Sequence, residues 1–98
     1  MVPKIVVSGV ARVIVSIKIY PSDATVDLNL LKKRIERELP EYASVYKFAE
    51  EPIAFGLVAL IVHIIIPEER SGSLDEIEGC LRGIREVGEM ETLMVRRI

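Results

Sequence analysis

The residue types that could do chemistry are few in this sequence, and they are widely spaced. His63 is the only histidine and Cys80 the only cysteine. The chain therefore has neither the several His and Cys ligands of a zinc site nor a second thiol for a disulfide or redox pair. His63 lies among aliphatic residues, where a structural role is favoured over metal binding. Cys80 has no histidine near it in sequence and is expected to be a packed thiol.

Two acidic pairs, Glu50-Glu51 and Glu68-Glu69, flank a long apolar segment. Paired carboxylates can act in general acid–base catalysis, but no nucleophile or perturbing group accompanies these. Solvated strand ends are the favoured interpretation. The sequence also has no glycine-rich phosphate loop of the G-x-G-x-x-G or G-x-x-x-x-G-K-[ST] type. We therefore expect no catalytic residue, no metal site, no bound cofactor and no covalent enzyme chemistry.

The apolar segment from Ile53 to Ile66 is too short for a bilayer, which takes roughly 20 apolar residues in a helix. It is bounded by Pro52 and Pro67 and is rich in β-branched residues. These features predict a buried strand from Leu57 onward, with alternate residues on each face of a sheet. The core side is expected to hold Val58, Leu60, Val62, Ile64 and Ile66.

The composition fits one small domain. Half of the 98 residues are hydrophobic, 29% are charged and the formal net charge is −2, so the chain can fold but offers no broad attraction to a phosphate backbone. A single cysteine and the absence of a clean secretory leader favour a cytoplasmic protein. We expect neither direct nucleic-acid binding nor a membrane segment.

The elements that must position any site alternate in a recognisable order. Strands are predicted near residues 11–21, 43–52, 57–66 and 89–98, and helices near 25–39 and 73–84. Thr25 or Asp27 can cap the first helix, and Ser73 with Glu76 has the spacing of a capping box. In the second strand, Val45 and Lys47 are expected to face away from Tyr46 and Phe48.

This order, β-α-β-β-α-β, predicts an α+β fold of the ferredoxin-like type. A four-stranded antiparallel sheet would carry both helices on one face and leave the other face open. The same fold houses RNA-recognition modules that stack bases on aromatic residues. With only 5% aromatic residues and no basic aromatic motif, that function is not favoured.

Two features at element ends stand out. Phe55 lies between Ala54 and Gly56 just before a strand, where it is either an anchor of the core or an exposed loop residue. At the chain end, Arg96-Arg97-Ile98 places two guanidinium groups at the end of the last strand. From the residues alone, a solvated tail is favoured there.

Four stretches, "EEPIAFGLVAL", "YKF", "VDLNLLKKRI" and "VRRI", resemble the archaeal translation elongation factor 1-beta family. The resemblance covers about Arg12 to Ile98 and leaves residues 1–10 as an N-terminal extension of a single exchange-factor domain, 1–98. It implies a protein that promotes exchange of GDP for GTP on elongation factor 1-alpha, the GTPase that carries aminoacyl-tRNA to the ribosome. Such a factor binds the GTPase, disturbs its magnesium and phosphate site and lets GDP leave.

The resemblance also implies which residues bind the partner. Related eukaryotic exchange domains have an aromatic-glycine pair, matched here by Phe55-Gly56, and a penultimate lysine that approaches the magnesium site, where this chain has Arg97. A planar guanidinium and a compact ammonium are not interchangeable. The eukaryotic lysine pair after the aromatic-glycine is absent, because Val58-Ala59 stands there. Weaker partner-binding candidates are Arg96 and Ile98.

The partner implied is elongation factor 1-alpha, and the free chain is expected to be monomeric. An alternative from another class is a small ferredoxin-like regulatory or ligand-binding domain that dimerises through its open sheet face. Binding to the GTPase, or its absence, distinguishes the two.

Overall fold

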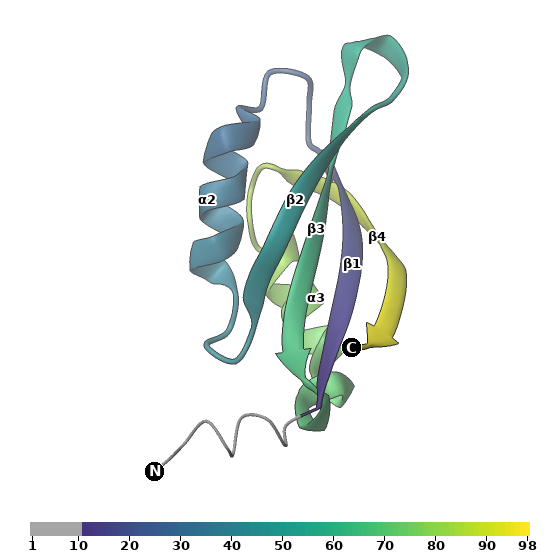
Figure 1. The fold of residues 1–98 in the computed structure, drawn as a ribbon. Helices are drawn as coiled ribbons and strands as arrows, with labels where there is room; N and C mark the ends of the chain where they lie inside the picture. Colours follow the sequence, from purple (N-terminus) through teal and green to yellow (C-terminus); the bar gives the residue numbers. More distant parts are fainter. Residues whose placement is uncertain (1–10) are drawn as a thin grey trace.

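The computed structural model describes residues 11–98, apart from the side chains of Ser71 and Ser73; the expected extension at residues 1–10 lies outside the described residues. The elements follow the predicted order (Figure 1). They are β1 (Arg12–Pro21), α2 (Leu28–Glu38), β2 (Ser44–Pro52), β3 (Val58–Pro67), α3 (Leu74–Arg82) and β4 (Val87–Arg97). Short 3-10 turns lie at Ala54–Gly56 and Glu68–Ser73.

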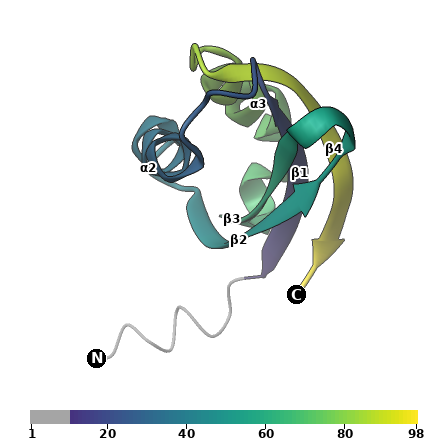
Figure 2. The same cartoon turned by 90° about the horizontal axis from the view of Figure 1, so that it is seen from above.

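The four strands form one sheet in the order β2-β3-β1-β4, and each neighbouring pair is antiparallel. Seen from above, α2 and α3 lie within the curve of the sheet (Figure 2). The ferredoxin-like α+β fold is therefore confirmed, with two helices on one face and the other face open.

The core lies between the sheet and the helices, and it follows from the alternation of the two central strands. Its buried members come from the two central strands and both helices: Val13, Val15, Ile17 and Ile19 of β1, Leu60, Val62, Ile64 and Ile66 of β3, Leu31 and Ile35 of α2, and Ile77 and Leu81 of α3, with Ile84 after it. Each fully buried aliphatic side chain of this kind stabilises the fold by about 1.5–3 kcal/mol. The predicted core face of β3 is confirmed, except that Val58 at its start is only partly buried.

Helix α2 begins at a side-chain cap supplied by Asp27. Its Oδ1 accepts hydrogen bonds from the backbone N–H groups of Asn29 at 2.9 Å and Leu30 at 3.4 Å. Thr25, the other expected cap, instead donates its backbone N–H to Asp23 at 2.8 Å. The predicted capping role of Ser73 concerns a side chain outside those described.

Both edge strands carry extra residues. In β2 the register with β3 shifts between Val45 and Lys47, and in β4 the register with β1 shifts at Gly88 and again at Leu93. The expected pairing of Val45 with Lys47 on one face is therefore wrong: Val45 and Phe48 both pack against the core, because Tyr46 is bulged out. Bulges of this kind increase local twist and discourage edge-to-edge pairing with another sheet.

The apolar segment that could have suggested a membrane is a strand of this sheet. Within residues 11–98, no helix has the length and apolar character needed to cross a bilayer.

Candidate functional site

The turn between β2 and β3, here called the hairpin tip (Ile53–Leu57), has an unusual backbone. It is closed by the Ile53 N–H, which donates to the Leu57 carbonyl at 2.8 Å, and by the Leu57 N–H, which donates to the Ala54 carbonyl at 3.2 Å. Inside the turn, Phe55 has φ 61° and Gly56 has φ 77°. Glycine adopts this left-handed region freely, whereas it costs another residue about 1–2 kcal/mol. Phe55 is the one non-glycine residue at positive φ in the described part of the chain.

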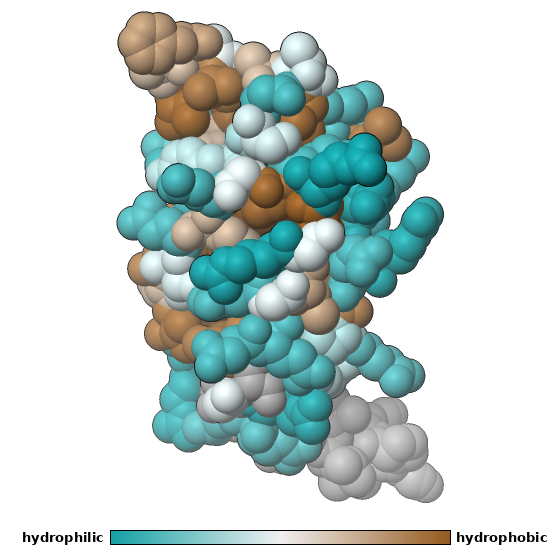
Figure 3. All heavy atoms as spheres, turned by 180° about the vertical axis from the view of Figure 1, so that it is seen from behind, coloured by the Kyte–Doolittle hydropathy of each residue, from teal (hydrophilic) through white to brown (hydrophobic). Residues whose placement is uncertain are grey.

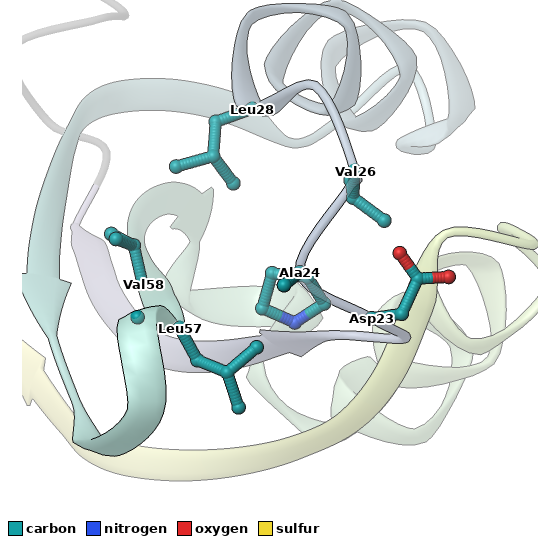
Figure 4. Close-up of a pocket in the computed structure, with 8 residues that line it drawn as sticks. Asp23, Ala24, Val26, Leu28, Leu57 and Val58 are labelled. Carbon is teal, nitrogen blue, oxygen red and sulfur yellow. The ribbon is translucent and has the colours of Figure 1, made fainter.

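The side chain of Phe55 is exposed. Its exposed fraction is 96%, so of the two alternatives left by the sequence, the structure shows the loop residue and not the core anchor. A small hollow of about 70 Å³ lies behind the tip, and Figure 4 shows Leu57 and Val58 lining it opposite Val26 and Leu28. These aliphatic residues close this end of the fold, and Phe55 is left free of the core.

The base of the hairpin is held on both sides by ion pairs. Glu50 Oε2 lies 3.1 Å from Lys32 Nζ of α2, and Glu51 Oε1 lies 3.3 Å from Lys18 Nζ of β1. The Glu51 carboxylate raises the pKa of Lys18 above its ordinary value. Consecutive residues of a strand point to opposite faces, so the two pairs restrain β2 from its helix side and its open side. Glu50 and Glu51, which the sequence predicted to be solvated strand ends, therefore each form an ion pair.

The second group of predicted residues lies at what we call the carboxyl end (Arg96–Ile98). Arg96 is registered opposite Ile14 and Arg97 opposite Val13, so the two guanidinium groups leave opposite faces of the sheet. Arg97 Nη2 contacts the carboxylate of Glu68. The N–H of Ile98, whose side chain is half exposed, donates to the Arg12 carbonyl at 3.0 Å.

The predicted site residues do not form one cluster. Strands β3 and β4 are both antiparallel to β1 and therefore run in the same direction. Phe55 precedes β3 and Arg97 ends β4, so the tip and the carboxyl end lie at opposite ends of the sheet (Figure 1). For a ten-residue strand such as β3, this separation is about 30 Å.

His63 and Cys80, the other residues considered for chemistry, lie in surroundings that suit a structural role. His63 Nδ1 lies 2.7 Å from Ser16 Oγ on the open face of the sheet. Burial, with a contribution from the Lys47 ammonium, lowers the pKa of His63. Among residues 11–98, no group of three or more His, Cys, Asp or Glu side chains is placed to hold a metal. Cys80 is partly buried on α3.

Apolar and charged side chains are distributed unevenly over the surface. Viewed from behind, hydrophobic atoms gather around the end that carries the tip, whereas hydrophilic atoms cover much of the remaining surface (Figure 3). Phe55 has the largest exposed fraction of the exposed large hydrophobic residues. The tip thus offers an apolar contact, whereas the carboxyl end combines two guanidinium groups with the exposed side chain of Ile98.

Comparison with known proteins gives one consistent result. Residues 14–98 match the model of the EF-1 guanine nucleotide exchange domain. The protein named elongation factor 1-beta in Staphylothermus marinus is 39% identical over 88 residues, which are 90% of this chain and 98% of that protein. The proteins of the same name in Methanothermobacter thermautotrophicus and Aeropyrum pernix are each 42% identical, over 88% and 90% of this chain and 96% and 98% of their own.

Proposed function

This chain belongs to the family of EF-1 guanine nucleotide exchange domains, and on that premise we propose that it promotes exchange of GDP for GTP on elongation factor 1-alpha. It would do so as a monomer in the cytoplasm, without touching nucleic acid or membrane. The relatives described above are named elongation factor 1-beta, and the match covers nearly their whole length. We expect exchange to require no catalytic group from this chain.

The exposed Phe55 is the observation that carries this proposal. The ring is almost wholly exposed to water, and its backbone is in the left-handed region. It therefore adds nothing to the stability of the fold. Strain of this kind is often retained where it serves a contact with another molecule. Buried aromatic anchors dominate protein interfaces energetically, so the ring is suited to enter an apolar pocket of the GTPase, with Gly56 permitting a close approach.

The carboxyl end supplies the second contact. Arg97 is mostly exposed, with its side chain 72% accessible, and its charge can attract the phosphate oxygens that magnesium otherwise holds. Arg96 and Ile98 are weaker contributors beside it. Because the ends are about 30 Å apart along the strands, they engage separate parts of the GTPase surface.

Exchange follows from differential binding. If the chain binds the nucleotide-free GTPase more tightly than the GDP-bound form, GDP must bind more weakly to the complex by the same factor. Disturbance of the magnesium and phosphate site by Arg97, together with insertion of Phe55, would provide that difference.

The test is release of fluorescent GDP from elongation factor 1-alpha. We expect acceleration at micromolar concentrations of this protein, and loss of most of it in Phe55→Ala and in a chain lacking Arg97-Ile98. A rate that does not change with added protein would exclude the proposal. Light scattering provides the control for the alternative function: a dimer that forms without any binding to the GTPase would favour the regulatory domain.

A further inference from the structure

We infer that Glu68 is a positioning residue for Arg97: its carboxylate holds one nitrogen of the guanidinium and leaves the others directed at the magnesium and phosphate site of the GTPase. This inference rests on the proposed function, since it concerns how Arg97 is presented to the GTPase.

The backbone on both sides of this ion pair is held by the first residues of the sheet. The Glu68 N–H donates to the Ala11 carbonyl at 2.9 Å, and the Ile98 N–H donates to the Arg12 carbonyl at 3.0 Å. Glu68 therefore starts its 3-10 turn at a fixed position beside the last residues of β4. Its side chain is 34% accessible, against 72% for Arg97, so the carboxylate is the more enclosed partner and the guanidinium projects beyond it.

The contact uses only part of what the guanidinium can donate. Arginine presents five N–H donors in a rigid planar fork, and the contact with Glu68 is made through Nη2. The donors on Nη1 and Nε are not engaged by any other hydrogen bond within residues 11–98. One arginine can thus bridge a carboxylate of its own chain and an oxyanion of the partner.

A lysine at this position would behave differently. Its ammonium is a single compact charge on a flexible stem, and Glu68 would compete with the partner for it. The fork of Arg97 allows both contacts at once, and Glu68 removes part of the side-chain freedom that binding would otherwise have to remove. The pair accounts for an arginine at residue 97.

The experiment measures the maximal rate of GDP release at saturating protein for Glu68→Ala and for Glu69→Ala. Glu69 is a matched control because it is the adjacent carboxylate and forms no ion pair among the described residues. Each change is made in the natural chain and in Arg97→Gln. Exposed ion pairs contribute about 0.2–1 kcal/mol. We therefore expect Glu68→Ala to slow release by about 1.4- to fivefold in the natural chain and not at all in Arg97→Gln.

Two further readouts separate positioning from a structural role. Glu68→Gln keeps an acceptor oxygen and should restore part of the rate, while Glu69→Ala should match the natural chain. Affinity for the nucleotide-free GTPase should fall in Glu68→Ala and stay unchanged in Glu69→Ala, because weaker binding to the empty site is what lessens the release of GDP.

Failure of the proposed role of Arg97 and failure of the positioning role of Glu68 give different results. If Arg97→Gln releases GDP as fast as the natural chain, the proposed role of Arg97 is wrong and the inference fails with it. If Arg97→Gln is slow but Glu68→Ala is as fast as the natural chain, or slows both backgrounds equally, only the positioning role of Glu68 is overturned.

Discussion

Replacing Phe55 by glycine should separate the function of this protein from its stability. The ring is 96% exposed, so about 4% of an aromatic side chain's 150–250 Å² is removed from the fold. At about 25 cal/mol per Å², that loss amounts to about 0.2 kcal/mol. Because φ is 61°, glycine also relieves a backbone strain of about 1–2 kcal/mol.

The gain is partly offset because glycine has more freedom in the unfolded chain, which costs about 0.5–1 kcal/mol. The free energy of unfolding of Phe55→Gly should therefore equal that of the natural chain or exceed it by up to about 1 kcal/mol. An aromatic anchor of an interface contributes about 2 kcal/mol or more. GDP release at sub-saturating protein should accordingly slow by about thirtyfold.

Urea denaturation followed by far-ultraviolet circular dichroism measures the stability, since the chain has no tryptophan, and release of fluorescent GDP measures the function. Tyr46→Ala is the control: it removes another exposed aromatic residue, 60% accessible, from β2 outside the tip. A Phe55→Gly chain destabilised by more than 1 kcal/mol would show that the ring packs against the fold. An unchanged release rate would show that the ring makes no important contact.

The remaining predictions concern the elements that support the two ends. Asp27→Ala should lower the free energy of unfolding by about 1 kcal/mol, because two N–H groups of α2 lose their acceptor; a melting temperature equal to that of the natural chain would contradict this. Replacing Glu50 and Glu51 together by glutamine should weaken GTPase binding more than it changes the thermal midpoint, because both restraints at the base of the hairpin are lost; an unaltered affinity would argue against the restraint. Below about pH 6.5, where the unfolded chain protonates first, the free energy of unfolding should fall, since His63 has a lowered pKa when folded. His63→Gln should reduce this slope in denaturation curves between pH 7.5 and 4.5, and an equal slope in both chains would assign it to other groups.

Much of the fold could be predicted because the strands and helices obey simple periods. The alternation in β1 and β3 located the core, and Pro40 marked the region where α2 ends. The face of Phe48 could not be predicted, because an extra residue at Tyr46 reverses the alternation and bulges leave little trace in a single sequence. The choice between Thr25 and Asp27 as helix cap likewise depended on the turn formed by Asp23.

The choice of candidate site residues stays a prediction, whereas their arrangement is given only by the structure. Sequence reasoning selected Phe55 and Arg97, yet left open whether the ring is buried. Their placement at opposite ends follows from strand direction once the sheet order is known. The contacts of Arg97 with Glu68 and of Lys32 with Glu50 join segments far apart in the chain. No local sequence pattern predicts such ion pairs.

The most direct test of the account compares the affinity of this protein for elongation factor 1-alpha with and without bound GDP and magnesium. Exchange by differential binding predicts tighter binding to the nucleotide-free form, by a factor equal to the weakening of GDP in the complex; couplings of about 1–3 kcal/mol, or about 5- to 150-fold, are typical. Equal affinity for the two forms would contradict the account, however tightly the proteins bind.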